Sequence, residues 1–138
     1  MLVKDNDNIL THNQWSVGQY LKNTTGYNRY RGVTLEVTDR LILTQDNTDN
    51  YGWCDIPVEL EPLTEYTITV KLKTNCVWVM ALNNDGNTPI GRVNINANDD
   101  VQTVTLTLTT PEEISNNLIR FFHSTPNAML ELVEIILQ

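Results

Sequence analysis

The segment 60–73, which reads LEPLTEYTITVKLK, constrains the fold of this chain more than any other segment. A turn at residues 61–64 is followed by strict alternation of apolar and polar residues. Side chains along a β-strand point alternately to its two faces, so the pattern predicts a strand with one buried and one wet face. Sheets of this kind are typical of antiparallel sandwiches, whereas parallel α/β sheets are covered on both faces.

The remaining segments also read as strands separated by turns. The apolar runs are short, and Asn, Asp, Gly and Pro lie between them. The segment 129–137 shows a weak helical period, but in a chain of strands we expect a strand there. The expected strands cover residues 8–11, 33–37, 41–44, 51–60, 66–73, 77–82, 92–96, 101–110, 118–124 and 129–137, with an irregular continuation of the first at 14–21.

About ten short strands predict an all-β fold, an antiparallel β-sandwich or a barrel. We find no internal repeat, and the length of 138 residues fits a single domain, 1–138, with residues 1–7 as a linker or flexible start. We expect a turn at residues 98–100, and the acidic segment 111–114 could form one helical turn.

The charge of the chain argues against several partners. The formal net charge is -8, which disfavours nucleic acid and anionic lipid as ligands. No apolar stretch is long enough to predict membrane insertion. The N-terminal residues lack the pattern of a secretory signal peptide. We therefore expect a chain that is made for the cytosol, released by lysis or excised from a longer protein.

Neither a catalytic site nor a zinc site is indicated. The chain contains no G-x-S-x-G or H-E-x-x-H motif, and most aspartates occur in polar turns, so we expect no enzyme. Two cysteines, Cys54 and Cys76, are too few for a structural zinc site, and we expect both to be unpaired and buried. They could pair if their strands were neighbours.

Aromatic residues give the strongest indication of a binding site. Because Ile56, Val58 and Leu60 form the inward side of their strand, Tyr51, Trp53 and Asp55 should point to its wetter side. A sugar ring offers an apolar face and a rim of hydroxyls, so an exposed aromatic beside a polar group suits it. Alternatively, the loop at residues 27–31 covers Trp53.

Four further residues are candidate ligand contacts. Tyr27 and Tyr30 lie in a turn-rich loop beside two arginines. Trp78 lies in a strand that is apolar on both faces, so it could equally belong to the core. Arg120 and His123 should point to opposite faces of their strand, and Arg120 could bind hydroxyls or form a salt bridge.

The order of these segments resembles a known family of modules. The residues that carry the resemblance are NIL near the start, LEPLTEYTITVKLKT, VWVMAL, VQTVTLTLTTP, LIRFF and LELVEIIL. They resemble the jelly rolls of carbohydrate-binding modules, with a galactose-binding-like sandwich, that are found on bacterial glycoside hydrolases and in phage tail and baseplate proteins.

The resemblance implies two sheets of about five strands and a sugar site on the concave face or in the end loops. It also implies a structural calcium ion, for which Asp5, Asp7, Glu131 or Glu134 could supply oxygens; otherwise we expect no cofactor. We therefore expect a non-catalytic module that binds a glycan, such as a cell-surface polysaccharide, on a virion or extracellular surface. The alternative is an assembly domain of a virion or multidomain protein, with a homo-oligomer or a longer parent protein left open.

Overall fold

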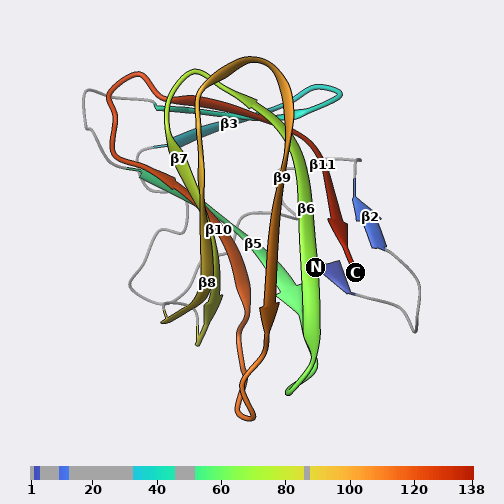
Figure 1. The fold of residues 1–138 in the computed structure, drawn as a ribbon. Helices are drawn as coiled ribbons and strands as arrows, with labels where there is room; N and C mark the ends of the chain where they lie inside the picture. The colour runs from blue at the N-terminus through green and yellow to red at the C-terminus, as the bar shows by residue number, and fades with distance from the viewer. Residues whose placement is uncertain (1, 4–9, 13–32, 46–51, 86–87) are drawn as a thin grey trace.

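The computed structural model describes residues 2–3, 10–12, 33–45, 52–85 and 88–138, and these form an all-β sandwich (Figure 1). Within them no helix is long and apolar enough to cross a membrane. The strands are β1 (Leu2–Val3), β2 (Leu10–His12), β3 (Val33–Val37), β4 (Leu41–Gln45), β5 (Gly52–Glu59), β6 (Glu65–Thr74), β7 (Trp78–Asn84), β8 (Thr88–Ile95), β9 (Asn98–Thr109), β10 (Leu118–His123) and β11 (Met129–Leu137).

The strands form two layers, as the sequence predicts. One sheet has the order β1-β5-β10-β7-β8, and the other has the order β3-β4-β11-β6-β9, with β2 pairing with β11. Every pairing between strands is antiparallel except that of β1 with β5, which is parallel. Strands far apart in sequence are therefore neighbours, and β10 lies between β5 and β7.

The alternation in β6 places its side chains as predicted. Tyr66, Ile68, Val70 and Leu72 are buried between the two sheets. Threonines dominate the outward positions of β6 and its partner β9; Thr67 Oγ1 and Thr107 Oγ1, for example, are 3.1 Å apart and hydrogen-bonded. The opposite layer contributes large buried side chains, among them Phe121 and Trp78. The hydrophobic core thus fills the space between the sheets, and each sheet keeps an outer face.

Three local expectations were wrong. Asn98 to Asp100 begin β9 instead of forming a turn, because exposed polar residues are tolerated at the end of an edge strand. Residues 111–114 form bends without a helical turn. Within the segment expected to be a linker, Leu2 and Val3 pair with Val58 and Glu59 as β1.

The turn between β5 and β6 holds a leucine in a strained backbone conformation. Leu63 has a φ of 52° and is 69% exposed. Thr110 holds this turn, since its hydroxyl donates to Glu61 O at 2.6 Å and accepts from Thr64 N at 2.9 Å. A left-handed conformation costs a residue with a Cβ about 1–2 kcal/mol.

We expect Leu63→Gly to raise the free energy of unfolding by up to about 1 kcal/mol, because glycine adopts this conformation without the steric penalty. Leu63→Ala is the matched control, since it also removes the exposed side chain but keeps the Cβ. Urea unfolding of both variants measures the difference. An equal effect of glycine and alanine would show that the backbone at Leu63 is not strained.

Candidate functional site

Strand β5 presents its candidate residues on the outer face of the β1-β5-β10-β7-β8 sheet. Cys54, Ile56 and Val58 are buried on the core side. Trp53 and Asp55 therefore point to the opposite side, which confirms the predicted parity. Tyr51 lies outside the described residues.

Strand register arranges the outer-face residues in two rows that run across the sheet. Trp53 lies opposite Phe122, which lies opposite Val79, which lies opposite Asn94. We call these four residues the aromatic row. Two positions further along the strands, the arginine row consists of Asp55, Arg120, Ala81 and Arg92.

An ion pair joins the first two residues of the arginine row. Arg120 Nε donates to Asp55 Oδ1 at 2.7 Å, and Arg120 Nη2 donates to Asp55 Oδ2 at 3.0 Å. The Asp55 side chain is 0% exposed and that of Arg120 is 15% exposed. The expectation that Asp55 faces solvent was therefore wrong, because parity defines the face of a strand but not what covers it. Arg120 forms the salt bridge that the sequence left open.

Each arginine of the row also lies over an aromatic ring of the other row. The guanidinium carbon of Arg120 is 5.3 Å from the centre of the Trp53 ring. The guanidinium carbon of Arg92 is 5.6 Å from the centre of the Phe122 ring. Both distances lie within the range of a cation–π contact. Each of the two guanidinium groups therefore lies on the outer face next to a ring of the aromatic row.

Solvent reaches one end of this surface more than the other. Arg92 and Asn94 are exposed, and Val79, Phe122 and Trp53 are half-buried. These five residues and Arg120 form the candidate site. The four strands that carry it span about 14 Å, at roughly 4.8 Å between neighbours.

Sequence reasoning missed Phe122, Arg92, Asn94 and Val79 as candidates. Phe122 could have been found, because alternation in residues 118–124 places it on the same face as Arg120. Arg92 and Asn94 could not, because they join the site only through the pairing of β8 with β7.

Of the other predicted contacts, Trp78 falls within the described residues. Trp78 is fully buried in the core, so it offers no surface to a ligand and is removed from the set. Its ring centre is 4.7 Å from that of His123, which is also buried, and burial lowers the pKa of His123. Tyr27 and Tyr30 lie outside the described residues.

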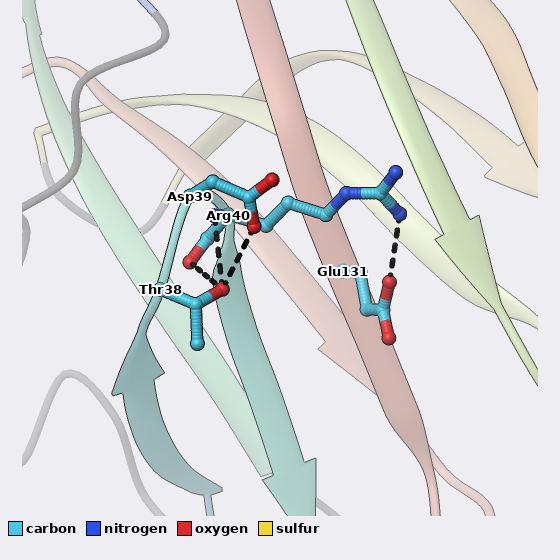
Figure 2. A network of polar contacts seen from close by, with 4 residues as sticks. All are labelled: Thr38, Asp39, Arg40 and Glu131. Carbon is cyan, nitrogen blue, oxygen red and sulfur yellow. Dashed lines mark hydrogen bonds and ion pairs between the residues drawn. The ribbon is translucent and has the colours of Figure 1, made fainter.

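Two of the acidic residues considered for calcium take part in ion pairs. Glu131 Oε2 accepts from Arg40 Nη1 at 2.9 Å, and the Arg40 side chain reaches it from the β3–β4 turn (Figure 2). Glu134 Oε1 is 3.7 Å from Lys71 Nζ. Asp5 and Asp7 lie outside the described residues. In the described part of the chain no three Asp, Glu, His or Cys residues cluster in a way that could hold a metal ion.

The two cysteines are unpaired and differ in burial. Cys54 is fully buried, and burial raises the pKa of its thiol, with a smaller effect from the charge of Asp55. Cys76 is only partly buried, which contradicts the expectation of two buried thiols, and desolvation raises its pKa as well.

We expect a thiol reagent such as DTNB to modify one cysteine in the folded protein and two in denaturant, because only Cys76 is accessible. Cys76→Ser should then abolish the reaction of the folded protein. A reaction of Cys54 at a comparable rate in that variant would contradict its burial.

A shallow hollow adjoins the β5 end of the candidate site. Its volume is about 260 Å³, and it is lined by residues 57–59 of β5, by Leu60 and by residues 114–117 before β10. The backbone N–H of Val58 donates to Asn117 O at 3.1 Å, which holds the two lining segments together. The carboxylate of Glu59, which is exposed, adds a polar group to this end of the sheet.

Comparison with known proteins identifies the fold. No family model matches the chain, and no curated protein matches it by sequence. A solved structure of a family 29 carbohydrate-binding module matches with a TM-score of 0.61 at 12% identity, over 94% of this chain and 88% of that one. The module described as BiXyn10A CBM1 in its apo form matches with a TM-score of 0.67 at 6% identity, over 96% of each chain.

A structure described as CBM4 matches with a TM-score of 0.59 at 16% identity, over 92% of this chain and 83% of that one. Several of the family 29 structures are arginine, aspartate, tyrosine or lysine variants made to probe ligand recognition. At these identities the likeness shows that the sandwich fold is shared with carbohydrate-binding modules.

Proposed function

We propose that this protein is a non-catalytic carbohydrate-binding module and that the candidate site binds a glycan. The observation that carries the proposal is the aromatic row, in which Trp53 and Phe122 lie directly opposite each other on neighbouring strands, each with an arginine close to its ring. Aromatic faces suit the C–H face of a sugar ring, and the arginines and Asn94 can donate hydrogen bonds to its hydroxyls. The fold shared with carbohydrate-binding modules supports the same function.

The shape of the site favours a chain of sugars over a single sugar. The aromatic row crosses four neighbouring strands, and the hollow lined by Pro57 lies further along β5. An extended oligosaccharide could therefore lie along the aromatic row and contact both rings. Asp55 contributes indirectly, because it holds Arg120 over Trp53.

The finer part of the proposal concerns the source of the glycan. We propose a cell-surface polysaccharide as the ligand and a virion or an extracellular surface as the location of the module, for example within a phage tail or adhesion protein. The order of the sequence segments, which resembles such modules, supports this part. A parent protein or a homo-oligomer would add avidity by presenting several sites together.

A binding screen tests the proposed function. The protein would be run by affinity electrophoresis through gels that contain neutral or acidic plant and bacterial polysaccharides, with bovine serum albumin as a non-binding reference. Retardation by at least one polysaccharide is expected, and calorimetric titration with its oligosaccharides should then give a stoichiometry of about one. Unchanged mobility with every polysaccharide would argue against glycan binding.

Light scattering separates this function from the alternative of an assembly domain. If the outer face of β5, β10 and β7 served to join subunits, the protein would form a stable oligomer that Trp53→Ala dissociates. For a glycan-binding face, we expect the same molar mass for the wild type and for Trp53→Ala.

A further inference from the structure

Both arginines of the arginine row lie over an aromatic ring, but only one of them also has a carboxylate opposite it. Arg120 lies over Trp53, and Arg92 lies over Phe122, at similar distances. Asp55 stands directly opposite Arg120 and binds it with both carboxylate oxygens. The residue directly opposite Arg92 is Ala81, which has no polar side chain.

Arg92 has no carboxylate partner among the described residues of the chain. Its side chain is exposed and forms no ion pair or hydrogen bond within that part. The other two arginines of the described part, Arg40 and Arg120, both pair with a carboxylate. The chain has only nine lysines and arginines against seventeen acidic residues, so an arginine without such a partner on the candidate site stands out.

Stacking prepares Arg92 to bind a planar anion. A guanidinium group that lies over a ring uses its face for the cation–π contact and keeps its in-plane N–H donors available. These donors match the two oxygens of a carboxylate, as Asp55 and Arg120 show on the same sheet. The contact with Phe122 restricts the Arg92 side chain, which lowers the entropy lost on binding.

We propose that the glycan bound at the candidate site carries carboxylate groups and that Arg92 binds one of them. The ligand is then a polysaccharide that contains uronic acid. In this arrangement the sugar ring contacts Phe122 and Trp53 while its carboxylate occupies, beside Arg92, the place that Asp55 occupies beside Arg120. This inference rests on the proposed function, since it names the class of glycan for the same site.

With a net charge of -8, the protein as a whole does not attract an acidic polysaccharide, so the preference for one must come from residues that contact it directly. The molecule as a whole repels a polyanion, so selective binding of one requires a cation in direct contact with the ligand. Asp55 is neutralised by Arg120, and Arg92 therefore supplies the positive charge of the site. Because part of the affinity comes from an exposed ion pair, we expect it to fall as the salt concentration rises.

A matched pair of ligands tests the inference. Glucuronoxylan would be compared by calorimetric titration with the same polymer after chemical reduction of its carboxyl groups, which makes it neutral and leaves the backbone unchanged. A charge-assisted bidentate contact predicts about tenfold tighter binding of the acidic polymer. Alginate and polygalacturonate would extend the comparison to other uronic acids, and dextran sulfate would show whether a sulfate can replace the carboxylate.

Variants of Arg92 then test whether this residue causes the preference for the acidic polymer. Arg92→Gln removes the charge, and the variant should bind the acidic polymer no more tightly than the reduced polymer. Arg92→Lys keeps the charge without the planar pair of donors and should retain only part of the preference. Lys73→Gln is the control, because it changes the net charge equally on the outer face of the other sheet and should leave the preference intact.

The outcomes separate this inference from the proposed function. The role of Arg92 would be overturned if the wild type bound both polymers equally, or if the preference for the acidic polymer survived Arg92→Gln. The proposed function would still hold in either case, provided that a neutral glycan binds in a way that depends on Trp53. Failure of every polysaccharide to bind would remove the proposed function itself. Thermal unfolding of the variants checks that the exposed substitution at Arg92 leaves the fold unchanged.

Discussion

Substitution of Trp53 by alanine should lower the affinity for the glycan by at least about tenfold, and by about a hundredfold if Trp53 carries the main stacking contact. The indole ring is half-buried beside Arg120 and offers the largest apolar face of the candidate site. Its removal takes away both the stacking surface and the support for the Arg120 guanidinium. Calorimetric titration with the oligosaccharide found in the screen measures the loss.

Thr105→Ala provides the matched control for this prediction. Thr105 is exposed on β9, on the outer face of the other sheet, so its substitution should change neither affinity nor fold. Phe122→Ala, which removes the second ring of the aromatic row, should reduce affinity as well. An affinity that Trp53→Ala leaves unchanged would show that the glycan binds elsewhere.

Asp55→Asn is expected to destabilise the fold by about 3–5 kcal/mol, the largest change in stability that we predict for a single substitution. The Asp55 side chain is 0% exposed, and the variant removes the carboxylate that pairs with the guanidinium of Arg120, which is 15% exposed. A domain of this size has a total stability of about 5–15 kcal/mol, so the loss is large. Urea unfolding followed by tryptophan fluorescence measures it.

The Arg40–Glu131 pair is the natural comparison for this ion pair. Its side chains are 32% and 20% exposed, and Figure 2 shows Arg40 extended from a turn to reach Glu131. Glu131→Gln should therefore cost less than about 1 kcal/mol, because solvent screens the pair. The double variant Asp55→Leu, Arg120→Met should recover much of the stability lost in Asp55→Asn, since it removes both charges of the pair. Similar losses from Asp55→Asn and Glu131→Gln would contradict the difference in burial.

The sandwich could be predicted because buried and exposed positions alternate along single strands and can be recognised within one segment of sequence. Tyr66, Ile68 and Leu72 alternate with polar residues, and that period alone defines a buried and a wet face. In β5 the same argument placed Trp53 on the outer face. The prediction from alternation failed where both faces of a strand are apolar, as around Trp78, because the pattern there cannot distinguish the core from the surface.

The candidate site could be predicted only in part, because it depends on register between strands. The stacking of Arg92 on Phe122 requires β8, β7 and β10 to be neighbours in that order. No local pattern specifies such pairing, since any of several polar outward positions could have faced Phe122. The burial of Asp55 was missed for the same reason, because its partner Arg120 comes from another strand.

One NMR titration tests most directly whether this outer face binds glycan. Backbone amide and tryptophan indole signals would be followed as the oligosaccharide found in the screen is added. The largest shifts are expected at the Trp53 indole, at Phe122 and at Arg92, while Thr67 and Thr105 on the opposite sheet remain unchanged. Shifts concentrated on the threonine-rich face of β6 and β9, with those of Trp53 and Phe122 absent, would contradict the assignment of the site.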